Sequence, residues 1–354
     1  MLLKPLSKSL PNWGLVLLAY ILFLSGHTLS ASASDKAIAV ACSPSKKKTA
    51  DLGNLVVATQ VTFAPAVEWA SRADCFAKYG IKVRTQVVAS TSIGMAGLVG
   101  GTYDLVVNTA TNLIQAMANG GLEGKIVAPR HGYTAQELAR AKQEPLYPGE
   151  LLMQTALIVR ADSDIKNWKD LVGKKVAVQS INGASHAGVL QAMRASGAVL
   201  DRTEFLAVAP SQMGIALQRK SVDAVIPNDP FASDLIIGGA RVIGYPDAYL
   251  ADPGAYVLYV STKEAIRKNR AAMVAFQKAI LESNALLNRP ENESSIRDLT
   301  VEVTGVSKEA AARLRLPTMT ERKVAFTDLA YLPVKLKSIG FLKTRVNLTP
   351  ILFW

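Results

Sequence analysis

The chain has 354 residues, of which 49% are hydrophobic, so it can form one large or two medium domains with a full core. Its net charge is +12, but the basic residues are spread along the chain and form no stripe with interleaved aromatic side chains, which argues against nucleic-acid binding. The one basic cluster, at residues 46–48, lies in a Ser/Thr/Pro-containing segment and is typical of a solvated leader.

The first 33 residues have the pattern of a secretory signal peptide. Lys4 and Lys8 precede an apolar run at residues 13–24, and small residues at 31–33 resemble a cleavage site. The apolar run is short for a bilayer span, so uncleaved membrane anchoring is the weaker alternative. We therefore expect an exported protein of the periplasm or cell envelope, whose mature chain carries 38 basic and 28 acidic residues.

Residues 34–53 are rich in Ser, Lys and Ala and predict a flexible tether. The two cysteines are Cys42 and Cys75. Export permits a disulfide between them, and the three residues before Cys42 faintly resemble a lipoprotein acylation site. Inert thiols are the favoured interpretation, because Cys75 falls in a helical pattern and Cys42 lies far beyond the apolar run.

From residue 55 onward, strands alternate with helices. The pattern predicts strands at 55–59, 81–88 and 104–107, a helix at 66–78, and helices that begin after Ser92 and Asn112. Strands and helices that alternate at this spacing are typical of βαβ units with a parallel sheet.

The same order recurs 119 residues later without a gap. At this offset Gln60 meets Gln179, and Asp104 meets Asp223. Few residues are identical, but each strand, polar loop and helix falls in register. We expect two similarly built lobes, each an open α/β sheet; the alternative is that any two βαβ segments look alike.

Two crossings would join the lobes. The first spans residues 131–158 and includes a strand at 152–159 and a short helix that Thr134 caps. The return crossing contains strands at 241–244 and 255–260. Lobe 1 then comprises residues 54–130 and 256–354, and lobe 2 comprises residues 159–255. Long helices are predicted at 262–288 and 321–339, with a third that begins at Ser307.

Polar loops follow the predicted strands of both halves. In two facing lobes these strand ends converge on one cleft, where hydroxyls, amides and helix N-termini hold small polar ligands. Each of these residues could instead only cap a helix. The candidate ligand-binding residues are Thr62, Phe63, Thr91, Ser92, Thr109, Thr111, Asn112, Asn182, Ser185, His186, Asn228 and Asp229.

His186 and Asp229 are the two candidates whose side chains can change charge. His186 is predicted at a helix start, where the dipole disfavours the imidazolium, so a ligand hydrogen bond or an aromatic wall fits it better than base catalysis. Asp229 suits a ligand amine, hydroxyl or cation, or it caps the helix after Pro230. No metal motif, G-x-S-x-G elbow or P-loop is present, so we expect no catalytic residue, metal or cofactor.

Several segments resemble the nitrate/sulfonate/taurine group of periplasmic solute-binding proteins. They are FAKYGIKV at residues 76–83, GTYDL at 101–105, IKNWKDLVGKKVAV at 165–178, SVDAV at 221–225 and NDPF at 228–231. The resemblance covers about residues 54–349. Two features depart from the group's pattern: the stretch 131–150 is longer, and Asn228 stands where the group usually has Trp.

The resemblance implies a two-lobed type II periplasmic-binding-protein fold that closes by a hinge on a small solute. The partner would be an ABC permease in the inner or cytoplasmic membrane, with the binding protein a monomer. The solute would be a sulfonate-, taurine- or nitrate-like anion, or an aromatic or amide compound. An enzyme on the same fold, of the pyrimidine-precursor or menaquinone-pathway type, and a ligand-sensing module for a membrane receptor are the alternatives. The residues at the group's ligand-contacting loop positions are Thr62, Ser92, Thr109, Asn182, Ser185 and Asp229.

Overall fold

The computed structural model describes residues 38, 41–43, 50–143 and 151–353, all within one structural unit at residues 37–354. The predicted signal peptide, the basic cluster at 46–48 and part of the first crossing lie outside the described residues. Within the described ranges, none of the helices combines the length and the hydropathy that a membrane span needs.

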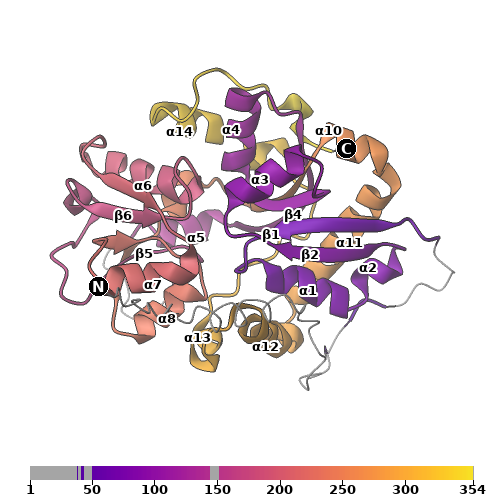
Figure 1. The fold of residues 1–354 in the computed structure, drawn as a ribbon, viewed down its shortest axis with the longest axis horizontal. Helices are drawn as coiled ribbons and strands as arrows, with labels where there is room; N and C mark the ends of the chain where they lie inside the picture. Colours follow the sequence, from indigo (N-terminus) through magenta and orange to yellow (C-terminus); the bar gives the residue numbers. More distant parts are fainter. Residues whose placement is uncertain (1–37, 39–40, 44–49, 144–150, 354) are drawn as a thin grey trace, which may run out of the picture. The chain divides into compact units, whose positions relative to one another are not determined.

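The first sheet has five strands, which lie across it in the order β2 (Lys82–Val87), β1 (Asn54–Thr59), β3 (Leu105–Thr109), β10 (Gly254–Thr262) and β4 (Gly124–Tyr133). β1 pairs in parallel with β2 and β3, whereas β10 is antiparallel to β3 and β4. One face carries α1 (Ala64–Arg72) and α2 (Cys75–Lys78), and the other carries α3 (Thr91–Val99) and α4 (Ala110–Gly120) (Figure 1).

The second sheet repeats this plan with β7 (Glu204–Ala207), β6 (Lys175–Val178), β8 (Ala224–Val225), β5 (Leu157–Val159) and β9 (Arg241–Gly244), in that order. β6 is parallel to β7 and β8, and β5 is antiparallel to β8 and β9. Its helices are α6 (Ala184–Ala195), α7 (Pro210–Gln218), α8 (Phe231–Ile237) and the short α9 (Asp247–Leu250).

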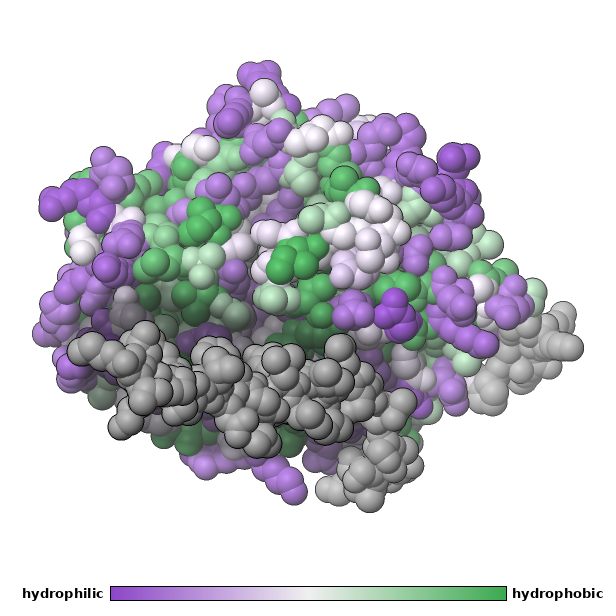
Figure 2. Space-filling view, in the orientation of Figure 1, coloured by the Kyte–Doolittle hydropathy of each residue, from purple (hydrophilic) through white to green (hydrophobic). Residues whose placement is uncertain are grey.

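The remaining helices lie mostly in the C-terminal third of the chain. They are α5 (Ala135–Arg140), α10 (Lys263–Lys268), α11 (Arg270–Leu287), α12 (Glu293–Thr304), α13 (Lys308–Arg313) and α14 (Leu332–Ser338). The 3-10 helices are η1 (Trp168–Leu171), η2 (Pro290–Asn292), η3 (Phe326–Asp328) and η4 (Thr349–Ile351). Figure 2 shows mainly hydrophilic residues around the edge of the face that it draws and hydrophobic residues toward the middle.

The correspondence between the two lobes at an offset of 119 residues extends to individual hydrogen bonds. The Asp104 carboxylate accepts from the Val56 N–H at 2.8 Å, and the Asp223 carboxylate accepts from the Lys175 N–H at the same distance. In each case one aspartate, just before β3 or its counterpart β8, holds the beginning of β1 or its counterpart β6. The predicted fold of two lobes, each with a mixed sheet flanked by helices, is therefore confirmed.

Each sheet contains one antiparallel strand at the same place, next to β3 in the first sheet and next to β8 in the second. In the second sheet that strand is β5, which precedes the lobe's other strands in the chain; in the first it is β10, which follows the whole second sheet. The predicted strands of the return crossing correspond to β9 and β10. The predicted capping box is confirmed at α5, where the Glu137 N–H donates to the Thr134 hydroxyl and the Glu137 carboxylate accepts from the Thr134 N–H.

Three predicted helices are wrong in extent. The helix expected at 66–78 divides into α1 and α2 because Asp74 adopts a positive φ of 56°. The helix expected at 262–288 divides at Asn269, which leaves helical geometry between α10 and α11. The helix expected at 321–339 is only α14, since Pro333 lacks an N–H and fits the first turn of a helix but not its interior.

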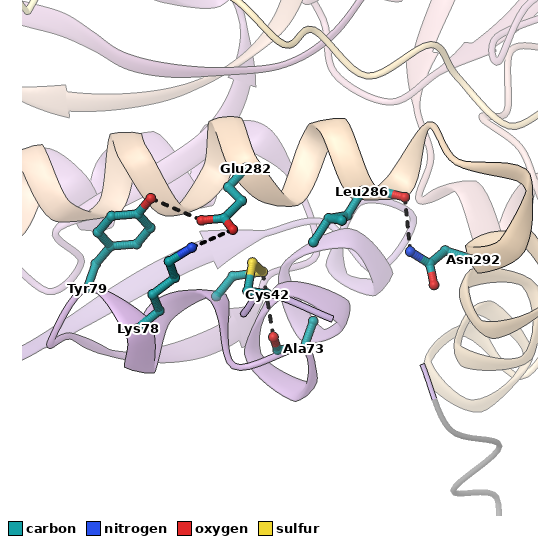
Figure 3. The surroundings of a disulfide bond; sticks show 8 residues. Cys42, Ala73, Lys78, Tyr79, Glu282, Leu286 and Asn292 are labelled. Atoms are coloured by element: carbon teal, nitrogen blue, oxygen red, sulfur yellow. Dashed lines mark hydrogen bonds and ion pairs between the residues drawn. A yellow bond between two sulfur atoms is a disulfide. The ribbon is translucent and has the colours of Figure 1, made fainter. Parts of the chain in front are cut away.

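Cys42 and Cys75 form a disulfide, so the expectation of inert thiols is wrong (Figure 3). Both side chains are buried, and the Cys42 N–H donates to the Ala73 carbonyl at 3.0 Å. The turn at Asp74 starts α2 and places Cys75 within bonding distance of Cys42. The bond also occupies the sulfur that lipid anchoring at Cys42 would need. The composition of residues 34–53 predicted a flexible tether and gave no sign that Cys42 is bonded to Cys75.

Candidate functional site

A pocket lies where the carboxyl ends of strands from both sheets meet. About 510 Å³ of space, part of it open to solvent, separates its walls. β1, β3, β6 and β8 each deliver a side chain at or just after their last residue, as expected for ligand sites in open α/β sheets. We call it the central pocket, and its lining residues are Gln60, Phe63, Thr91, Thr109, Asn112, His131, Tyr133, Gln154, Thr155, Gln179, Ser180, Ala184, Ser185, Asn228, Asp247, Tyr256 and Val257.

Two glutamines occupy equivalent positions in the two lobes and both line this pocket. Gln60 follows β1, and Gln179 follows β6 at the 119-residue offset. Gln60 is only 3% exposed, yet neither its amide nitrogen nor its amide oxygen has a hydrogen-bond partner within the described part of the chain. The Thr109 hydroxyl is buried and without a partner in the same way. Because unpaired buried polar groups are costly, these atoms are poised for a ligand or for water.

The lobes touch each other along one rim of the pocket. The Gln115 side-chain amide in α4 donates to the Asn182 carbonyl at 2.7 Å, and the Thr91 and Ser180 hydroxyls lie 3.5 Å apart. A shallower hollow on this rim is lined by Thr91, Ser92 and Asn112 from one lobe and by Ser180 and Asn182 from the other. These contacts hold the two walls near each other without a covalent link.

Asp247 brings a carboxylate to the wall of the central pocket. It begins α9 and is 4% exposed. The hydroxyl of Tyr133 donates to its Oδ2 at 2.9 Å, and that of Tyr256 donates to its Oδ1 at 3.1 Å. Burial raises the pKa of Asp247 above its usual value, although these hydrogen bonds oppose the shift. The three side chains join the return crossing to β4 and β10.

Phe63, His131 and Arg130 form a cluster at the side of the pocket. The rings of Phe63 and His131 have centroids 6.2 Å apart, and the Arg130 guanidinium lies 4.8 Å from the Phe63 centroid. Arg130 also bonds to Nδ1 of His131. Burial, together with the Arg130 charge, lowers the pKa of His131 well below its usual value, so this imidazole is neutral at ordinary pH.

The structure distributes the residues predicted from sequence over three sites and the protein interior. Six of them line the central pocket: Phe63, Thr91, Thr109, Asn112, Ser185 and Asn228. Ser92 and Asn182 lie on its rim, while Thr62 and Asp229 line a second pocket. Thr111 and His186 are buried and appear in the lining of neither pocket.

Both carboxylate oxygens of Asp229 accept hydrogen bonds from the protein. Its Oδ1 accepts from the Ser233 N–H and hydroxyl, and its Oδ2 accepts from the Arg315 N–H at 2.7 Å. Burial raises its pKa to about 6 against the effect of these donors. The carboxylate thus binds the first turn of α8, but the structure places Pro230 at the N-cap and Asp229 one residue before it. Contact of Asp229 with a ligand stays a prediction.

His186 packs as an aromatic side chain. Its ring lies 4.0 Å from that of Phe205 and 5.1 Å from that of Phe341, measured between centroids. Nδ1 accepts from the Asn182 N–H at 3.0 Å and so orders the loop that forms the pocket rim. Burial lowers the pKa of His186 to about 4.

We expect the His186→Phe variant to gain stability relative to the wild type as the pH falls. Folding keeps His186 neutral, whereas the unfolded chain binds its proton near pH 6.5, so the wild type loses stability between pH 6.5 and pH 4. The variant lacks this loss. Its unfolding free energy minus that of the wild type should therefore rise by about 1–3 kcal/mol between pH 7 and pH 4. Urea unfolding of both proteins at several pH values measures it. A difference that does not change with pH would contradict a buried neutral imidazole.

Sequence reasoning missed several residues that line the pocket. Gln60 and Gln179 carried a signal, their match at the 119-residue offset, but they were not assigned to the site. Tyr133, Asp247 and Tyr256 carried none, because they reach the pocket from the two crossings. Among the described residues, no group of three His, Cys, Asp or Glu side chains is placed to hold a metal ion.

Comparisons with known proteins agree with this architecture. A model of the NMT1-like family matches residues 44–301. The putative aliphatic sulfonates-binding protein of Escherichia coli is 30% identical over 141 residues, which is 40% of this chain; the match spans only 43% of that relative's length.

Two solved structures show the fold. The alkanesulfonate-binding protein SsuA of Xanthomonas axonopodis, bound to MOPS, is 16% identical with a TM-score of 0.69, over 85% of this chain and 98% of that one. The periplasmic aliphatic sulphonate binding protein SsuA of Escherichia coli is 20% identical with a TM-score of 0.62, over 85% and 92% of the two chains. All three relatives are named for binding, in line with the expectation of a protein that is not an enzyme.

Proposed function

The chain belongs to the NMT1-like family, and on that basis we propose that it is the extracytoplasmic solute-binding component of an ABC importer. The observation that carries the proposal is the central pocket, to which both lobes contribute equivalent polar residues. Gln60 and Gln179 face this pocket from the same position of each lobe, and the Gln60 amide has no protein partner. A solute that pairs with both would favour closure of the two lobes on it.

The pocket walls support a small organic solute with an amide or aromatic group. Neutral amides and hydroxyls dominate the lining, together with the rings of Phe63, Tyr133 and Tyr256. No Lys or Arg is among the described residues that line it, and Asp247 contributes a carboxylate. A sulfonate-, taurine- or nitrate-like anion would have to rely on helix N-termini and hydroxyls, which can hold an oxyanion without a formal counter-charge.

The proposal places the protein outside the cytoplasm, as a monomer that delivers its solute to a membrane permease. The Cys42–Cys75 disulfide supports export, since such bonds persist in oxidising compartments. The names of the relatives support transport over catalysis.

A thermal-shift screen of the mature protein tests the proposal. The panel should contain sulfonates, taurine, nitrate, amino acids, pyrimidines and aromatic acids. A bound solute raises the melting temperature with concentration, following RT ln(1 + [L]/Kd). Chromatography of the incubated solute then separates transport from catalysis, because a transport component returns it unchanged. Conversion of the solute by the protein alone would overturn the proposal in favour of an enzyme.

We expect Gln60→Ala and Gln179→Ala each to raise the Kd for the solute found in that screen by about 5- to 100-fold, because each removes an amide that lines the central pocket, buried at Gln60 and partly buried at Gln179. Isothermal titration calorimetry measures the change. Gln212→Ala is the matched control, since this glutamine is exposed on α7 and should leave the Kd unchanged. Unchanged affinity in both pocket variants would show that the solute binds elsewhere.

A further inference from the structure

A second pocket adjoins the central pocket and shares Gln154 with it. We call it the Arg130 pocket. Apolar side chains form most of its walls, contributed by α11, α12 and the segment after α13: Leu287, Ile296, Leu314, Leu316, Pro317 and Met319. Leu287, Leu316 and Pro317 are partly exposed, so they border solvent at its mouth. Its polar residues include Thr62, Arg130 and Asp229.

Arg130 is a buried cation without an acidic partner. Its side chain is on β4, and the residue is 5% exposed. It contacts the Phe63 ring and Nδ1 of His131, and its Nε has no hydrogen-bond partner. The described part of the chain gives it no ion pair. Neither of its two contacts supplies a negative charge, because His131 is neutral and the Phe63 ring is uncharged.

An unpaired buried guanidinium is expensive, because its lost hydration is not replaced by a counter-charge. Burial lowers the pKa of Arg130 to about 10, which reflects that cost. Asp229 does not relieve it, since both carboxylate oxygens accept from Ser233 and Arg315. Thr62 adds a buried hydroxyl without a partner at the same pocket. Two unsatisfied donors therefore lie beside an apolar wall.

We propose that the Arg130 pocket is a separate binding site for an amphipathic carboxylate. The planar guanidinium and the Thr62 hydroxyl would hold the carboxylate, and the apolar body would lie against Ile296, Leu314 and Met319. The guanidinium geometry matches a carboxylate, which can take two of its N–H groups. The site is distinct from the central pocket, because its cation and its apolar wall are absent from the lining of that pocket, although the two pockets share Gln154 and Arg130 contacts Phe63 and His131 of the central pocket.

Hexanoate is the probe, with hexanamide and acetate as its matched analogues. Hexanamide removes the charge and keeps the shape, while acetate keeps the charge and removes most of the apolar body. We expect calorimetry to give hexanoate a Kd lower than that of either analogue by about tenfold or more, because the charged hydrogen bonds and the apolar burial both contribute. Equal binding of hexanoate and hexanamide would overturn the proposal.

Arg130→Met tests the cation. This variant should raise the Kd for hexanoate by about tenfold or more, while the ligand-free variant melts no lower than the wild type because an unpaired buried charge has been removed. Arg313→Met is the matched control: this arginine is exposed on α13, does not line the pocket and should leave hexanoate binding unchanged.

Two further variants keep the proposal testable if Arg130→Met does not fold. Leu316→Asp changes only a partly exposed wall residue, and it should weaken hexanoate binding by adding a negative charge at the mouth. Gln179→Ala, in the central pocket, should leave hexanoate binding unchanged. Normal binding by Leu316→Asp would overturn the proposal, as would loss of binding in Gln179→Ala.

Discussion

Gly132→Ala is expected to lower the unfolding free energy by about 3 kcal/mol or more. Gly132 lies in β4 opposite Ala255 of β10, and an alanine Cβ at this position would lie 1.7 Å from the Gly254 carbonyl oxygen. No side-chain rotation can relieve that overlap, because the neighbouring atom belongs to the backbone. The two strands would have to separate, and the tyrosine–aspartate contacts of Tyr133 and Tyr256 would separate with them. The midpoint of urea unfolding, followed by circular dichroism, measures the loss.

Gly120→Ala is the matched control for this prediction. Gly120 ends α4 without a positive φ, and no atom lies within 4 Å of the position that its Cβ would take. Alanine favours helix over glycine, so this variant should be neutral or more stable by up to about 1 kcal/mol. A Gly132→Ala protein with the unfolding midpoint of the wild type would show that β4 and β10 are not packed as closely as described.

Removal of the Cys42–Cys75 disulfide is expected to cost about 3–4 kcal/mol, because the bond closes a loop with a sequence separation of 33 residues. The Cys42→Ala/Cys75→Ala protein should nevertheless fold. Glu282 on α11 accepts from the Lys78 ammonium at 2.7 Å and from the Tyr79 hydroxyl at 3.0 Å, and these contacts hold α2 independently of the disulfide (Figure 3). Unfolding by urea measures the difference.

Reduction of the wild-type protein supplies the control for the double variant. Dithiothreitol should lower the stability of the wild type toward that of the variant and leave the variant unchanged. A wild type that unfolds at the same urea concentration with and without reductant would mean that the two sulfurs are not bonded in solution.

The fold could be predicted from sequence because its signals are periodic and repeated. Alternating strands and helices gave the sheet class, and the matched Asp104 and Asp223 gave the number of lobes. Helix ends were harder, because they depend on single residues. Asp74 and Asn269 break helices through backbone angles that no apolar pattern records, and the meaning of Pro333 depended on knowing which turn it occupies.

The candidate site could be predicted only in part. Residues at strand ends, such as Thr109 and Asn228, were found because the sheet topology brings strand ends together. Asp247 looked like an ordinary turn residue after Pro246, and no sequence pattern singled out Arg130, which ends the first predicted segment of lobe 1. Both make contacts with residues distant in the sequence, Asp247 with Tyr133 and Arg130 with Phe63, and no local pattern reports those contacts.

The placement of β10 has a consequence for the order in which the chain can acquire structure. All five strands of the second sheet lie within residues 157–244, so this lobe can assemble from one continuous stretch. The first sheet cannot, because β10 separates β3 from β4 and ends at Thr262. During synthesis from the N-terminus, β3 therefore lacks its neighbour on one side, and β4 lacks the strand with which it pairs, until β10 follows the later lobe. The synthesis of lobe 1 therefore begins before that of lobe 2, but its sheet is completed later.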